Sequence, residues 1–240
     1  MSRLILASAS PRRKELLEQA GAVFEIIPAK GEEIITKKEP HEVVMELALQ
    51  KAKEVAAHLT MVHEKVPIPE EKVPIPEKGS PIQNEACMIL GADTVVVYDG
   101  KILGKPGNRE EAAGMLTALS GNTHSVYTRV AVIRQWEGRE QIWNFYEETK
   151  VAMYPMSPAE IESYLNYRER SCGEKDGAEA GSEKKYRYEW EDKAGAYAIQ
   201  GKCAIYIEKI MGDYNNVVGL PIARIYREML QSGIDIYGNL

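Results

Sequence analysis

The sequence predicts an α/β fold with a mixed, twisted sheet flanked by helices. Apolar segments typical of buried strands lie at residues 4–7 and 88–97, and amphipathic helical patterns lie between them. Segments 126–134 and 141–153 are rich in β-branched and aromatic residues, as expected for paired strands. Because strands and helices alternate irregularly, a mixed sheet is favoured over a regular parallel series. The polar stretches separate parts of one core, so residues 1–240 are expected to form one domain.

Composition excludes several classes of protein. Of the 240 residues, 44% are hydrophobic and 28% are charged, and the net charge is −6. This charge argues against a nucleic acid polymer as partner, and no apolar run is long enough to cross a bilayer. Cys87, Cys172 and Cys203 are widely spaced, which favours a reducing compartment over a disulfide framework or a zinc site. We therefore expect a cytoplasmic protein with no membrane contact.

The first strand is expected to lead directly into a helix. Ser10 is placed as its N-cap and Pro11 as its first residue, where the missing N–H group costs nothing. A second strand is expected at 24–28, and Pro40 begins a long helix that runs to about Leu59. The apolar positions of that helix repeat at helical spacing, and they are Val44, Leu47, Ala48, Ala52, Val55 and Leu59.

Two polar segments are expected to be surface insertions. Residues 64–70 are followed at once by an identical copy at 71–77, and the prolines of this repeat exclude a helix and disrupt strand pairing. We place an extended insertion at about 60–85. A second insertion is placed at about 171–187, where Gly, Glu, Lys and Ser dominate.

A hairpin and a capped helix follow the strand at 88–97. Asp99-Gly100 is a hairpin turn signal. Asn108 together with Glu111 predicts the start of a helix, and Gly121 predicts the residue beyond its end.

Two more helices are predicted towards the C-terminus. Ser157 and Glu160 form a capping box at the start of a helix that runs to about Tyr167. Residues 194–210 then return to small residues and strand formers, and Pro221 begins the last helix.

The loop after the first strand has the chemistry of an anion site. A helix N-terminus presents free N–H groups and the positive end of the helix dipole, which favour phosphate. Arg12 and Arg13 lie in the first turn and add guanidinium groups suited to phosphate oxygens. The alternative is an ordinary capped surface helix with solvated arginines, and this segment alone leaves both open.

Asp93 interrupts the apolar run at 88–97, where a carboxylate is costly unless it is paired, hydrogen-bonded or bound to a metal. It is either a structural aspartate that accepts backbone hydrogen bonds or a catalytic or metal-binding carboxylate. Glu33 follows a strand and offers a second carboxylate for Mg²⁺, although its position alone favours a solvated loop.

Two lysines and one segment of small residues are further candidates. Lys51 falls within the apolar stripe of the long helix, so it either extends past the edge of the core or points into a cleft. Lys105 lies just beyond the hairpin, whose geometry can return it towards Asp93, although a surface lysine is the alternative. The small residues in 192–201 allow a close approach to a ligand or serve packing alone.

These segments, in this order, resemble the Maf family of nucleoside triphosphate pyrophosphatases. The matching motifs are LASASPRR at 6–13, GADTVV at 91–96, GKP at 104–106, LSG at 119–121, DKAGAY at 192–197, IQG at 199–201 and VGLP at 218–221. The resemblance covers nearly the whole chain outside the two insertions, and Ala198 stands where many relatives have glycine. It implies a mixed α/β fold shared with inosine triphosphatase-like enzymes, often in homodimers.

The resemblance implies hydrolysis of a nucleoside triphosphate to the monophosphate and pyrophosphate with a divalent metal, Mg²⁺ or Mn²⁺. The family's proton acceptor matches Asp93, and the positions that separate its subfamilies match Arg12, Thr94 and Gln200. These three residues indicate the dTTP/UTP branch. The alternatives are a pyrophosphatase for another nucleotide such as 7-methyl-GTP, or a nucleotide-binding regulator of septum formation without significant catalysis.

One mechanism joins these residues as a hypothesis. Glu33 and Asp93 hold the metal, and water activated there attacks the α-phosphorus. The phosphate oxygens are bound by Ser8, Arg13, Lys51 and Lys105. Gln200 and Thr94 contact the 4-keto pyrimidine through an amide and a hydroxyl. This mechanism requires the carboxyl group of Asp93 to face the guanidinium cluster across a shared cavity.

Overall fold

The computed structural model describes residues 3–31, 40–64, 86–170 and 186–237. Most of both expected insertions and the candidate metal ligand Glu33 lie outside these ranges. Within them, no helix is both long and apolar enough to cross a membrane.

A seven-stranded mixed sheet forms the centre of the fold, as the sequence predicts. Its path runs β2-β1-β3-β5-β6-β9, and β4 pairs with β3 off this path. β1 pairs in parallel with β2 and β3, whereas the other pairs are antiparallel. The strands are β1 Arg3–Leu6, β2 Phe24–Ile26, β3 Cys87–Tyr98, β4 Lys101–Leu103, β5 Thr123–Trp136, β6 Arg139–Met153 and β9 Ile207–Met211.

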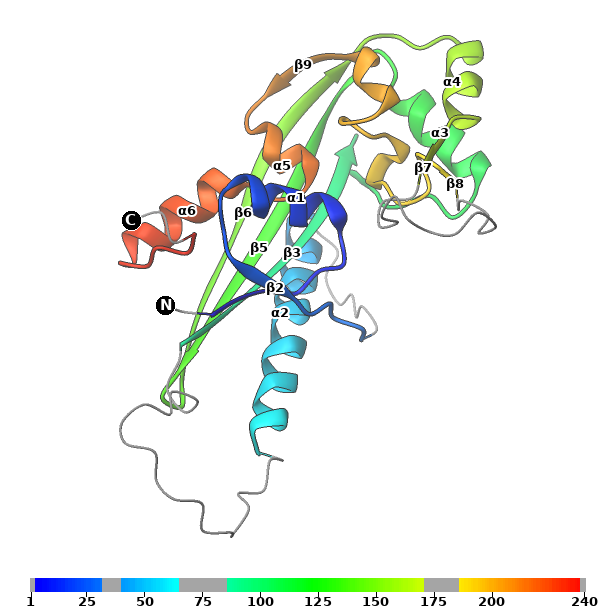
Figure 1. The fold of residues 1–240 in the computed structure, drawn as a ribbon. Coiled ribbons are helices and arrows are strands. Elements are labelled where there is room, and N and C mark those ends of the chain that lie inside the picture. The colour runs from blue at the N-terminus through cyan, green and yellow to red at the C-terminus, as the bar shows by residue number, and fades with distance from the viewer. Residues whose placement is uncertain (1–2, 32–39, 65–85, 171–185, 238–240) are drawn as a thin grey trace, which may run out of the picture.

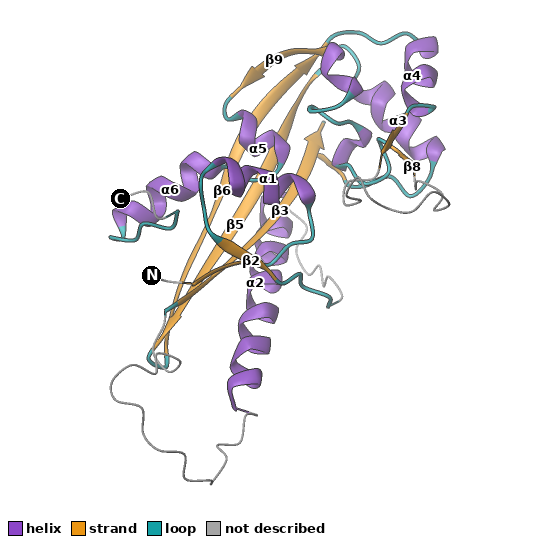
Figure 2. Ribbon diagram, in the orientation of Figure 1, coloured by secondary structure: helices purple, strands orange, loops and turns teal. Residues whose placement is uncertain are grey.

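Helices cover both faces of this sheet, as Figures 1 and 2 show. The helix α2, Pro40–Glu64, packs on one face against β3 and β5. The helices α1, Pro11–Gln19, α5, Tyr214–Val218, and α6, Ile222–Gln231, lie on the opposite face. At one end of the sheet, α3, Arg109–Leu119, and α4, Pro158–Leu165, form a second group with the short pair β7, Arg168–Arg170, and β8, Tyr186–Tyr188.

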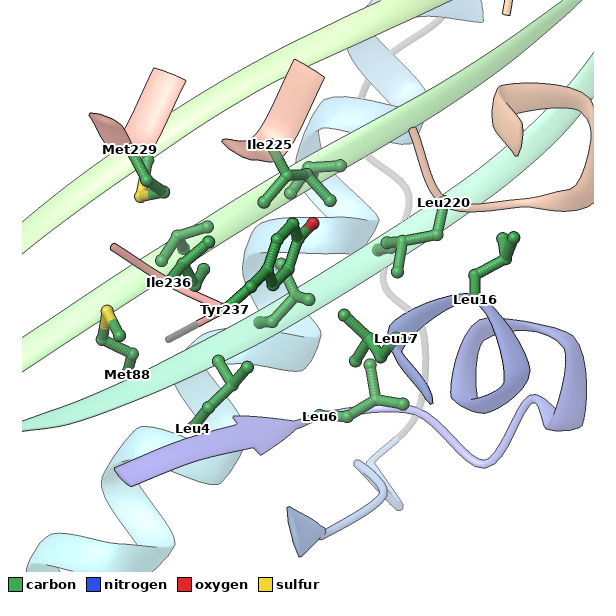
Figure 3. Close-up of a cluster of buried hydrophobic side chains, with 14 of the residues drawn as sticks. Leu4, Leu6, Leu16, Leu17, Met88, Leu220, Ile225, Met229, Ile236 and Tyr237 are labelled. Carbon is green, nitrogen blue, oxygen red and sulfur yellow. The ribbon is translucent and has the colours of Figure 1, made fainter. Parts of the chain in front are cut away.

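Three apolar clusters match these layers. The first lies between the sheet and the helices α1 and α6, and Figure 3 shows the side chains of Leu6, Leu17, Ile225 and Met229 converging there. The second lies around α3 and α4, and the third lies between α2 and the other sheet face. The buried members of the α2 stripe confirm its predicted spacing where the structure describes side chains, and they are Leu47, Ala48, Ala52 and Val55.

The three predicted N-cap residues are confirmed, and two of them also make the predicted capping hydrogen bond. Asn108 accepts a hydrogen bond from the backbone N–H of Glu111, and Ser157 and Glu160 form the predicted reciprocal capping box. Ser10 is the N-cap of α1, but its side chain makes no capping bond; its backbone N–H donates to Ser8 Oγ at 3.2 Å instead.

Several predicted boundaries are corrected. Helix α2 continues to Glu64 rather than stopping near Leu59, and α4 ends at Leu165 rather than Tyr167. Strand β8 overlaps the end of the segment expected to be an insertion at about 171–187, and it pairs with β7. The expected strand formers after residue 194 first form two 3₁₀ helices, at Ala194–Ala196 and Lys202–Tyr206, before β9 begins.

Candidate active site

The candidate site lies where one edge of β3 has no neighbouring strand. β1 pairs with Cys87–Leu90 and β4 pairs with 96–98, so residues 91–95 between them lack a strand partner on this edge within the described chain. The opposite edge of β3 is paired with β5 from Cys87 to Val97. Since the chain leaves β1 beside Leu90 and turns into α1, the helix N-terminus is brought to this open edge. We call residues 91–95 the open edge of β3.

On one face of the open edge, Arg13 is held by three neutral oxygens. Its Nε donates to the carbonyl oxygen of Gly219 at 2.9 Å, its Nη1 to Ser8 Oγ at 3.1 Å and its Nη2 to Thr94 Oγ1 at 3.2 Å. Gly219 follows α5 with φ of 126°, a left-handed conformation that favours glycine. The structure therefore brings Ser8, Arg13 and Thr94 together as a guanidinium cradle.

Two buried residues extend the cradle into the sheet. The hydroxyl groups of Thr94 and Thr128 lie 2.9 Å apart, and Thr128 donates to the carbonyl oxygen of Asn216 at 2.8 Å. Both Thr128 and Asn216 are completely buried. Sequence reasoning missed them, although Thr128 is a polar residue between the strand formers of 126–134, which is the signal that identified Asp93.

On the opposite face of β3, Asp93 forms an ion pair with Lys51. Lys51 Nζ lies 2.6 Å from Asp93 Oδ1, and the side chains are 20% and 15% exposed. Lys51 therefore points towards the site rather than extending into solvent past the core. Arg129 lies directly opposite Asp93 in the β3–β5 pairing, so the two side chains share a face. Arg129 is buried, its Nε donates to Asn144 Oδ1 at 2.9 Å, and burial lowers its pKa to about 10.

The expectation that Asp93 directly faces the guanidinium cluster is wrong. Successive side chains of a strand point to opposite faces, so Asp93 reaches α2 while Thr94 reaches Arg13. The two groups border the same open edge from its two sides. The mechanism therefore needs a ligand that lies across this edge and contacts both groups, in place of a cavity shared by two facing groups.

Arg12 points to a different carboxylate. Its Nη1 lies 3.3 Å from Asp192 Oδ2, and Asp192 also pairs with Lys193 and Arg187. Burial alone raises the pKa of Asp192, but the hydrogen bond from Lys193 and the charges of Arg12 and Arg187 bring it below its usual value. Arg12 is thereby held beside the segment that follows Asp192.

The remaining candidates are more exposed. Lys105 follows Gly104, whose carbonyl oxygen accepts a hydrogen bond from Gly195 at 3.1 Å, so the GKP and DKAGAY motifs are joined there. Gln200 is exposed, and next to it Glu189 accepts a hydrogen bond from the backbone of Lys202 at 2.9 Å. The structure gives Gln200 no contact with Arg12 or Thr94 among the described residues, so its role stays a prediction.

Fold and site together define an α/β protein with a guanidinium cradle at the open edge of a mixed sheet. The family model of the Maf-like protein matches residues 3–232, and the chain belongs to this family. A relative from Agathobacter rectalis named dTTP/UTP pyrophosphatase is 47% identical over 98% of this chain and 100% of its own length. Relatives of the same name from Bacillus cereus and Bacillus anthracis are each 41% identical over 98% of both chains.

Proposed function

We propose that this protein hydrolyses dTTP and UTP to the nucleoside monophosphate and pyrophosphate. The observation that carries the proposal is the open edge of β3, which has the Arg13 cradle on one side and the Asp93–Lys51 pair on the other. A triphosphate is long enough and charged enough to lie across such an edge. Relatives that carry this activity in their names align over the whole length of the chain, which supports the same substrates here.

The mechanism assigns roles to most of the candidate residues. Ser8 and Arg13 bind phosphate oxygens, and Lys51 and Lys105 neutralise the charge that gathers on the leaving pyrophosphate. The oxygen of a water molecule attacks the α-phosphorus, the bond from that phosphorus to the bridging oxygen breaks, and Asp93 accepts the proton of the water. Arg12 and Gln200 are the candidates for contacts with the nucleoside.

A divalent metal is part of the proposal. Mg²⁺ uses one or two carboxylates together with substrate phosphates and water, and Mn²⁺ accepts the same oxygen ligands. The partly exposed carboxylate of Asp93 fits this need, although no group of three metal-ligating side chains occurs in the described part of the chain. Glu33, the proposed second ligand, lies outside it. When bound, the ion supplies charge neutralisation and acidifies a bound water. A homodimer and a cytoplasmic location stay predictions.

The test is a panel of triphosphates at matched concentration, with pyrophosphate release as the readout. We expect dTTP and UTP to be hydrolysed fastest, ahead of CTP, ATP, GTP and 7-methyl-GTP, and EDTA to stop the reaction. Asp93→Asn is expected to lower kcat at least about 100-fold, since one such group supplies ~3 kcal/mol to the transition state. Asp99→Asn is the matched control, because Asp99 is an exposed turn residue with positive φ that asparagine tolerates.

Two results would contradict the proposal. Fastest turnover of 7-methyl-GTP would assign another nucleotide. Nucleotide binding without pyrophosphate release would make the chain a regulator rather than an enzyme.

A further inference from the structure

We infer that Thr128 and Asn216 are positioning residues for triphosphate hydrolysis, because they turn Thr94 into a fixed acceptor that holds Arg13 in the cradle. Thr94 then affects the reaction through the guanidinium group and the phosphates, and not by donating a hydrogen bond to the base. The kinetic test of this inference rests on the proposed function, but the hydrogen-bond geometry does not depend on that function.

The direction of each hydrogen bond follows from the end of the chain of bonds. The backbone carbonyl oxygen of Asn216 carries no proton, so Thr128 must donate its single hydroxyl proton to it across 2.8 Å. In the 2.9 Å contact between the hydroxyl groups, Thr94 must therefore be the donor. The proton of Thr94 is thus committed to Thr128, and the oxygen of Thr94 accepts from Arg13 at 3.2 Å.

Helix α5 anchors this chain of bonds at its buried end. The side-chain amide of Asn216 donates to the carbonyl oxygen of Val126 at 3.1 Å and to Thr149 Oγ1 at 2.9 Å, which ties α5 to β5 and β6. The same helix leads to Gly219, whose carbonyl oxygen accepts from Arg13 Nε. Helix α5 therefore holds the guanidinium group twice, directly through Gly219 and indirectly through Asn216.

The burial of Thr128 and Asn216 keeps the hydroxyl proton of Thr94 committed to Thr128. Thr128 and Asn216 are 0% exposed, so water does not compete for their hydrogen bonds. A Thr94 hydroxyl that is already donating inside the protein has no proton for the 4-keto oxygen of a pyrimidine. The direct hydroxyl contact expected from the sequence is therefore replaced by an indirect role. Recognition of the base is left to other groups, of which Gln200 is the candidate.

The test compares Thr128→Val, which keeps the shape and removes the hydroxyl group, with Thr128→Ser, which keeps the hydroxyl group. We expect Thr128→Val to lower kcat/KM about tenfold for UTP and CTP alike, as the loss of one buried hydrogen bond implies. Thr128→Ser is expected to stay within about twofold of the parent protein, since the donor remains. Thr94→Val is expected to act like Thr128→Val, and the double variant should lose little more, because both changes break one chain of bonds.

The decisive readout is the preference for UTP over CTP. A purely structural defect would lower the melting temperature, but it would not make Thr94→Val and Thr128→Val lose the same amount of kcat/KM. If Thr94→Val changes the UTP/CTP ratio, or if Thr128→Val matches the parent protein, the inference is overturned. Should Thr128→Val fail to fold, Thr94→Val and Thr94→Ser make the same comparison at a more exposed position.

A second measurement separates this inference from the proposed function. Binding of inorganic pyrophosphate, followed by calorimetry, needs no turnover. We expect Thr128→Val to weaken it and Thr128→Ser to preserve it, even if the parent protein hydrolyses no triphosphate in the panel. Equal binding by the two variants would contradict the inference while leaving the activity untouched.

Discussion

Two adjacent residues of β3 serve separate layers of the protein. Asp93 contacts Lys51 of α2, and Thr94 contacts Arg13 of α1. Because the alternation of a strand sends neighbours to opposite faces, one short motif supplies both a carboxylate and a hydroxyl without crowding either. In the proposed mechanism, the open edge of β3 lets these two layers act on one ligand.

His124 is a buried imidazole beside Tyr197 of the second apolar cluster. Its Nε2 lies 2.8 Å from the hydroxyl group of Tyr197, and burial lowers the pKa of His124 to about 4. In the unfolded chain this histidine has a pKa near 6.5. Between these values the unfolded state binds a proton that the folded state does not, so stability is lost as the pH falls from about 6.5 towards 4.

We therefore expect His124→Gln to flatten the acid side of the stability profile. The shift corresponds to a loss on the order of 3 kcal/mol across the window in the parent protein. Urea unfolding at several pH values between 4 and 7 measures this slope, which is independent of any constant change in stability caused by the substitution. His58→Gln, at an exposed histidine, is the control and should keep the parent slope. An unchanged slope in His124→Gln would contradict the prediction.

At the scale of elements, the position of Lys51 depends on how closely α2 approaches β3. A Cβ atom at Gly91 would lie 2.5 Å from the carbonyl oxygen of Ala48, so only glycine allows this contact. Lys51 follows Ala48 by about one helical turn, and Asp93 follows Gly91 on the same face of the strand. The close contact therefore sets the distance between the lysine and the carboxylate.

Gly91→Ala is expected to destabilise the protein by about 1–3 kcal/mol through overpacking, and to lower kcat because α2 must move away from β3. Gly114→Ala is the matched control. It lies exposed within α3 with open space at its Cβ, so it should stabilise the protein by about 1 kcal/mol or less. Urea unfolding and steady-state kinetics on both variants give the comparison. Wild-type stability and activity in Gly91→Ala would show that α2 adjusts without cost.

The elements that local signals specify were predictable from the sequence. Asn108, the Ser157–Glu160 box and Asp99-Gly100 mark helix starts and a turn by short-range chemistry, and all three are confirmed. Helix α5 and the 3₁₀ helices were not predicted, because segments of three to five residues are too short to carry a periodic pattern and their conformation depends on packing against β5 and β3. The sequence did not indicate that Arg13 and Thr94 meet on one face of β3 while Lys51 and Asp93 meet on the other, because this division depends on the pairing of β3. The roles of these residues stay predictions.

At the scale of the whole molecule, the long strands join the apolar clusters into one unit. β3 and β5 each contribute side chains to all three clusters, and Ile199 packs against both the first and the second. Such continuity predicts that the clusters do not unfold separately. A single domain over residues 1–240 stays a prediction.

Tryptophan fluorescence tests this cooperativity, because Trp143 packs against the first cluster and Trp190 lies in the second. With Trp136 replaced by Phe throughout, one variant keeps only Trp143 and the other keeps only Trp190. We expect each variant to give the same urea midpoint by fluorescence as by circular dichroism. A fluorescence midpoint that departs from the dichroism midpoint in either variant would reveal two separately unfolding parts.

The guanidinium cradle of Ser8, Arg13 and Thr94, with the carbonyl oxygen of Gly219, draws on three segments that lie far apart along the chain and meet only after folding. An oxyanion bound there therefore favours the native state alone, by mass action. Molecules loaded with product open less often than empty ones, and proteases act on opened chains. The lifetime of this protein in a cell should then lengthen when its substrates are abundant, without any dedicated regulator.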